Sequence, residues 1–144
     1  MDQFVERSPI DVLRVRGDLS PGGPAAAFDH LESKLTSIKG RKFYGSFQKR
    51  AGGEEYYACV ERRADDDPMR MGLEPARLPG GLYVRRKLAD WPLLARTGQI
   101  PVQARDLVAR HDLDPTRPEL EYYRSHTELH LLVPVASRQE RAIP

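Results

Sequence analysis

Four aromatic side chains and two carboxylates are the residues of this chain best suited to ligand binding. Aromatic faces attract organic cations by about 0.5–2 kcal/mol each. A partly buried carboxylate supplies the opposite charge if its desolvation is compensated. We expect Glu121 or Glu128 to be that carboxylate, in a cleft lined by aromatic rings. The residues assigned to this site are Tyr44, Tyr83, Trp91, Glu121, Tyr123, Glu128 and His130. Aromatic residues also fill ordinary cores, so a packed core is the alternative.

The same residues suit acid–base catalysis. A carboxyl group in a dry pocket has a raised pKa, which favours proton transfer. Glu128 is the main candidate for the acid or base, with Glu121 and His130 as the others. Tyr123 or Tyr83 would donate a hydrogen bond, so that water could attack a strained or electrophilic ring. The alternative is a carboxylate that binds charge and does no chemistry.

The segment His126-Thr127-Glu128-Leu129-His130 has the residue types of a zinc site. Alternation along a strand would place both histidines and the glutamate on one side. The helical zinc-protease motif needs a glutamate directly after the first histidine, and threonine stands there. We therefore interpret the segment as a polar strand face and expect no metal and no cofactor.

Composition excludes several other classes of protein. The chain has 144 residues, which suits one domain over residues 1–144. Its 23 basic and 21 acidic residues nearly balance, and no long basic run occurs, so we expect no direct nucleic-acid partner. A single cysteine, Cys59, excludes an internal disulfide and suits a reducing compartment. No signal peptide or membrane-spanning run is visible, so we expect a cytoplasmic protein without membrane contact.

The first half of the chain predicts the order strand, helix, strand, strand. Residues 12–16 combine β-branched residues with arginines and end at Gly17, which is typical of a strand. Residues 43–47 and 56–60 read as a hairpin around a glycine-containing turn. Between these strands the apolar spacing predicts a helix that ends near Lys39 and Gly40. Its apolar face consists of Phe28, Leu31, Leu35 and Ile38.

The second half repeats this order. Residues 82–86 read as a strand, helical material lies between residues 89 and 111, and residues 120–123 and 129–133 read as closing strands. Residues 12–16 and 82–86 correspond at an offset of about seventy. We expect an α+β fold of two β-α-β-β units, residues 1–64 and 72–136, that form an antiparallel sheet. A central ligand cleft would lie where the halves meet.

Short motifs in this order resemble a known family, the GyrI-like or effector-binding domain, which occurs alone or fused to bacterial regulators. The likeness spans almost the whole chain and indicates a stand-alone member. The matching segments are Phe4-Val5-Glu6-Arg7, residues 12–17, Tyr44-Gly45, residues 56–60, Leu78-Pro79-Gly80-Gly81-Leu82-Tyr83, Glu121-Tyr122-Tyr123 and Leu131-Leu132-Val133-Pro134-Val135.

The resemblance implies a duplicated α+β fold whose central cleft holds lipophilic, often cationic compounds, including drugs and toxins, between aromatic rings and an acidic residue. It also implies two alternatives: hydrolysis of cyclopropane-containing toxins in that cleft, and an inhibitory role toward a partner protein. One position departs from the family. Members often carry glutamate four residues before the closing proline, where this chain has His130; Glu128 would share its strand face.

Overall fold

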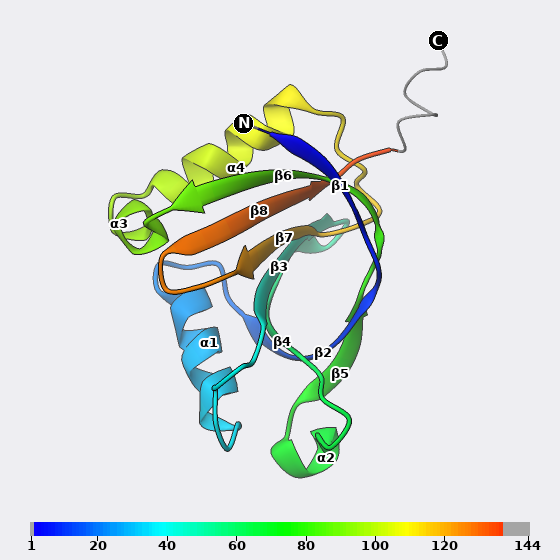
Figure 1. Cartoon of the computed structure of the whole chain (residues 1–144), viewed down its shortest axis with the longest axis vertical. Coiled ribbons are helices and arrows are strands. Elements are labelled where there is room, and N and C mark those ends of the chain that lie inside the picture. The colour runs from blue at the N-terminus through cyan, green and yellow to red at the C-terminus, as the bar shows by residue number, and fades with distance from the viewer. Residues whose placement is uncertain (1, 137–144) are drawn as a thin grey trace.

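One antiparallel sheet organises the computed structural model, which describes residues 2–136 (Figure 1). Within those residues the sheet has eight strands and curls into a half-barrel. From one edge to the other, its strands are β1 (Gln3–Arg7), β6 (Gly81–Ala89), β8 (Glu128–Pro134), β7 (Glu119–Tyr123), β3 (Phe43–Arg50), β4 (Gly53–Glu61), β2 (Ile10–Gly17) and β5 (Glu74–Leu78). The α+β class and the antiparallel sheet expected from the sequence are confirmed.

Strand order is symmetric about the central pair β3 and β7. Moving outward, β4, β2 and β5 follow on one side, and β8, β6 and β1 on the other. The helix α1 (Gly23–Ser33) links β2 to β3, and the helices α3 (Trp91–Arg96) and α4 (Gln99–Arg110) lie between β6 and β7. This arrangement supports our proposal that residues 1–64 and 72–136 are two repeats.

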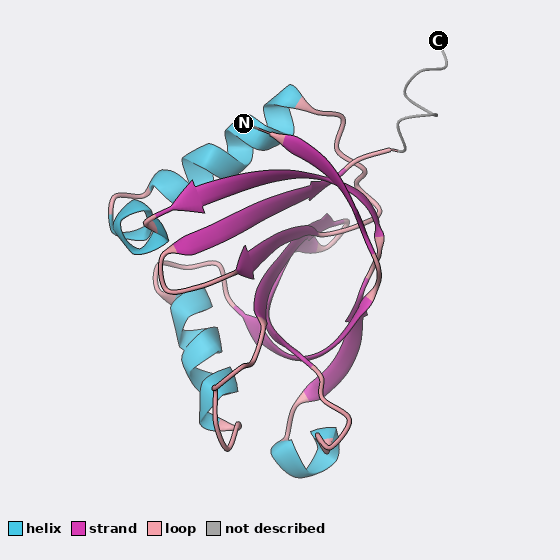
Figure 2. Cartoon of the chain, in the orientation of Figure 1, coloured by secondary structure: helices cyan, strands magenta, loops and turns pink. Residues whose placement is uncertain are grey.

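Helices α1, α3 and α4 cover the outer face of the curl (Figure 2). Leu13 and Val60 pair on β2 and β4 beneath α1, and Val84 and Val133 pair on β6 and β8 beneath α4. Because neighbouring strand residues alternate between faces, Val12 instead packs on the inner, concave face. The sequence alignment of residue 12 with residue 82 was therefore wrong by one position, since Leu82 faces the helices.

Helix α1 is shorter than its apolar spacing predicts. It ends at Ser33, and Ile38, expected on its buried face, is 51% exposed. The Ser33 hydroxyl donates to the carbonyl of His30 at 2.6 Å, a local bond by which serine competes with helical bonding. Leu31 still anchors the helix, as it is fully buried against β2 and β4.

Two short elements that follow β4 were not predicted from the sequence. The helix α2 (Pro68–Met71) is capped at its N-terminus by Asp67, whose side chain accepts from the backbone of Arg70, and β5 then pairs with β2. No helix in the described part of the chain is both long enough and apolar enough to cross a membrane.

Candidate ligand-binding site

The seven residues assigned from the sequence divide between the two faces of the sheet. Trp91, Glu121 and Tyr123 lie together on the helix-covered face, where Trp91 packs edge-on against Tyr123 and Tyr123 donates to Glu121. The other four lie on the concave face: Tyr44, Tyr83, Glu128 and His130. The seven residues do not line one shared space, because strand alternation separates them.

Glu121 is held by two tyrosine hydroxyls. Tyr56, on β4, donates to Oε1 of Glu121 at 2.8 Å, and Tyr123, two residues along β7, donates to the same oxygen at 3.1 Å. Gly45 stands opposite Glu121 in the β3–β7 register. A Cβ atom at Gly45 would lie 2.1 Å from Oε1, so the carboxylate occupies space that only glycine leaves open.

Aromatic rings from both halves pack against the two tyrosines that bind this carboxylate. Phe28, from α1, meets Tyr123 edge-on at 5.3 Å between ring centroids, and also contacts Tyr56 and Phe43 at 6.5 Å. Trp91 opens α3 and packs against Tyr123 at 5.1 Å, and its indole donates to the carbonyl of Ser125. We name this group the Glu121 cluster: Phe28, Phe43, Tyr56, Trp91, Glu121 and Tyr123.

The charge of Glu121 has no partner in the described chain. Within residues 2–136 no lysine, arginine or histidine forms an ion pair with it. Burial raises the pKa of Glu121 above its usual value, although the hydrogen bonds from Tyr56 and Tyr123 act in the opposite direction. The residue is still partly exposed. The carboxylate is therefore suited to take up either a proton or an external cation.

On the concave face, the predicted aromatic residues are packed and bonded. Tyr44 stacks on Tyr122 at 4.9 Å and accepts from Arg7, and burial raises its pKa to about 12. Tyr83 is fully buried; its hydroxyl donates to the carbonyl of Pro79 at 2.6 Å. Their side chains already have partners, as expected of core residues.

Glu128 and His130 share a hydrogen bond between Oε2 and Nε2 on the concave face. His130 is buried, which lowers its pKa, while its hydrogen bond lowers the pKa of Glu128. The two catalytic candidates, Glu128 and Tyr123, thus lie on opposite faces of the sheet. No cluster of three metal-ligating side chains is found among residues 2–136.

Phe28, Phe43, Tyr56 and Gly45 were not assigned to the site from the sequence. Phe28 was placed on a core-facing helix stripe, and residues 43–47 and 56–60 were placed in a hairpin. The missing information is the pairing of β3 with β7, which brings Gly45 and Tyr56 to Glu121.

Comparisons with known proteins identify the fold. No family model matches the sequence, and no curated protein matches it. An integron cassette protein from the mobile metagenome of Vibrio cholerae superposes with a TM-score of 0.69 at 16% identity, over 94% of this chain and 95% of that one. SAV2435 bound to tetraphenylphosphonium superposes with a TM-score of 0.66 at 11% identity, over 99% and 98%.

A third similar structure is a hydrolase from Listeria innocua, with a TM-score of 0.60 at 14% identity, over 94% of this chain and 91% of that one. The chain thus has the α+β fold expected of GyrI-like domains. At these identities the likeness shows the fold alone.

Proposed function

We propose that this chain is a GyrI-like domain that binds lipophilic organic cations at the Glu121 cluster. The observation that carries the proposal is a carboxylate bound by two tyrosines of an aromatic cluster, with neutral phenol donors and without a cationic partner in the described chain. The cluster draws on α1 and β4 from one half, and on α3 and β7 from the other. The structural likeness to SAV2435, which has been solved with tetraphenylphosphonium, agrees with this choice of ligand.

The chemistry of the Glu121 cluster favours a lipophilic cation over other ligands. Two phenol hydrogen bonds offset part of the cost of desolvating Glu121, but they leave its charge uncompensated. A bound cation would neutralise the charge of Glu121. Its apolar groups would contact rings such as Phe28 and Trp91, whose π-faces attract positive charge. An anionic guest would meet repulsion from Glu121.

Tetraphenylphosphonium should quench the fluorescence of the protein in a saturable manner. Trp91 is the single tryptophan of the chain and packs within the cluster, so its emission reports on occupancy there. Tetraphenylborate is the matched control, because it has nearly the same shape and the opposite charge; it should give no saturable change. A flat response to the phosphonium at high micromolar concentration would contradict the proposal.

Cation affinity should rise with pH and then level off. Because burial raises the pKa of Glu121, the free protein keeps this carboxyl protonated to higher pH than an exposed glutamate. The cation binds the ionised form, so binding below that pKa must release a proton. Calorimetry between about pH 4 and pH 8, in two buffers of different ionisation enthalpy, measures the release. An affinity that is independent of pH would show that Glu121 does not pair with the guest.

Hydrolysis in the same cluster is the second candidate. A glutamic acid with a raised pKa beside the hydroxyls of Tyr56 and Tyr123 is a suitable proton donor for a leaving group. Mass spectrometry after incubation with an electrophilic cyclopropane compound would detect the water-addition product. Product that forms with the unmodified chain and not with Glu121→Gln would favour a hydrolase, whereas binding without product supports a binding protein.

A further inference from the structure

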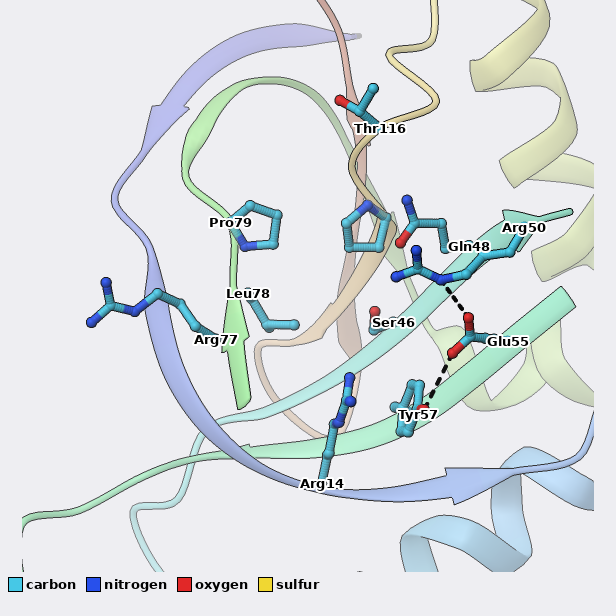
Figure 3. A pocket seen from close by; sticks show the side chains of 11 residues that line it. Arg14, Ser46, Gln48, Arg50, Glu55, Tyr57, Arg77, Leu78, Pro79 and Thr116 are labelled. Carbon is cyan, nitrogen blue, oxygen red and sulfur yellow. Dashed lines mark hydrogen bonds and ion pairs between the residues drawn. The ribbon is translucent and has the colours of Figure 1, made fainter. Parts of the chain in front are cut away.

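The concave face holds a pocket of about 220 Å³ that the proposed function leaves unused (Figure 3). It lies between β2, β3, β4, β5 and the loop that precedes β7. Strand alternation sets it back to back with the Glu121 cluster. Ser46 and Tyr57 face the pocket, whereas their chain neighbours Gly45 and Tyr56 face Glu121.

Basic side chains dominate the lining of this pocket. Three arginines line it against one carboxylate, Glu55. The guanidinium of Arg14 stacks over Tyr57, 3.7 Å from the ring centroid, and is held by Glu74 through Nε and Nη2. Arg50 is held by Glu55 through Nε. Both guanidinium groups are therefore oriented, and they keep terminal nitrogens that bond no acceptor among the described residues.

A serine hydroxyl lies on the same wall. Ser46 is only 7% exposed, yet its side chain has no hydrogen-bond partner within residues 2–136. Because Ser46 lines the pocket, its hydroxyl is free to donate to a ligand there. Figure 3 shows Arg14 and Arg50 directed toward the space around Ser46 from two sides, whereas Arg77 points away. An acceptor in that space would satisfy all three donors.

The remaining wall is apolar and the volume is small. Leu78, Pro79 and Pro118 form this wall. The pocket is smaller than the range of about 300–1,000 Å³ that is usual for drug-sized ligands. We propose that it binds a small organic carboxylate. The carboxylate oxygens accept hydrogen bonds from Arg14, Arg50 and Ser46, and a short apolar body rests on the prolines. Arginine matches a carboxylate with two parallel donors, and inorganic phosphate would leave the apolar wall unused.

An NMR titration with benzoate tests this assignment. Benzoate should shift the backbone amides of Ser46, Gln48 and Thr116 in a saturable manner, and benzylammonium and inorganic phosphate should not. Arg14→Gln and Arg50→Gln should each weaken benzoate binding about tenfold or more. Arg77→Gln is the matched control, because it removes the same charge from the rim without removing a donor; it should stay within about twofold.

Several results would overturn the proposal. One is that benzoate binding does not saturate, and another is that phosphate binds as tightly as benzoate. A third is an equal loss of benzoate affinity in all three arginine variants, which would indicate an effect of net charge alone. Ser46→Ala guards against misfolding, because it changes no ion pair; it should also weaken binding, and unchanged affinity would remove Ser46 from the site. Glu121→Gln should bind benzoate as the unmodified chain does, so this pocket can fail or succeed independently of the Glu121 cluster.

Discussion

Replacing Glu121 with glutamine should weaken the binding of tetraphenylphosphonium about thirtyfold or more, with the fold retained. Truncating the charge of one partner in an enclosed ion pair costs about 2 kcal/mol or more, which corresponds to that factor. Glutamine has the same size, and its carbonyl oxygen can still accept from Tyr56 and Tyr123, so the hydroxyls stay bonded. Calorimetry at neutral pH, with the Trp91 fluorescence titration as a second readout, measures the change.

Glu128→Gln is the matched control for this variant. It removes the same charge from the other glutamate assigned to the site, which is paired with His130 on the concave face. Affinity for the phosphonium should change by less than about twofold, because the sheet separates this side chain from the Glu121 cluster. If both variants lost equal affinity, overall charge would explain the effect. If Glu121→Gln bound as tightly as the unmodified chain, the cluster would not be the cation site.

Glu121→Gln should also flatten the dependence of stability on pH. A carboxyl whose pKa is raised by folding contributes its full stability below its unfolded pKa, and that contribution is lost as the pH rises through the folded value. At neutral pH the variant should therefore be at least as stable as the unmodified chain while it binds the cation more weakly. Urea unfolding at acidic and neutral pH measures the difference, and a variant that is less stable only at neutral pH would contradict the sign.

Strand patterns in the sequence predicted most of the sheet. The β-branched and aromatic runs of β2, β4, β6 and β8 lie where expected, since such residues fit a pleated, half-buried surface. Alternation also placed Glu128 and His130 on one face. Alternation does not give the register between neighbouring strands, and that register separates Glu128 from Glu121, because Glu121 pairs with Leu131. It also cannot fix the alignment of the repeats, which was displaced by one residue.

The composition of the Glu121 cluster depends on contacts that are distant in sequence. Glu121 and Tyr123 are two residues apart on one strand, so the sequence is sufficient to place them together. Tyr56 reaches Glu121 across 65 positions of sequence, and only after β3 has paired with both β4 and β7. The spacing of Phe28 predicts that it lies on the buried face of α1, but nothing in that spacing indicates that Tyr123 lies opposite.

Gly45 leaves the space that the carboxylate of Glu121 occupies. Filling this space should lower both the stability of the protein and its affinity for the cation. In Gly45→Ala, the new methyl group would lie 2.1 Å from Oε1 of Glu121 and 2.5 Å from the hydroxyl oxygen of Tyr56. Both atoms are ends of side chains, so one or both must move, and we expect the hydrogen bond between Tyr56 and Glu121 to weaken. We expect the free energy of unfolding to fall by about 1–3 kcal/mol, and tetraphenylphosphonium affinity to fall about tenfold or more. Urea unfolding and calorimetry measure the two effects.

Gly52→Ala controls for the substitution itself, because a Cβ atom at Gly52 meets nothing within 4 Å; its stability and affinity should match those of the unmodified chain. The double variant Gly45→Ala/Glu121→Ala separates the steric effect from the chemical one. Removing the carboxyl group makes room for the methyl, so part of the lost stability should return, whereas cation binding should not. That non-additivity is the expected signature of two residues in contact. Additive losses in the double variant would mean that Gly45 does not make room for Glu121.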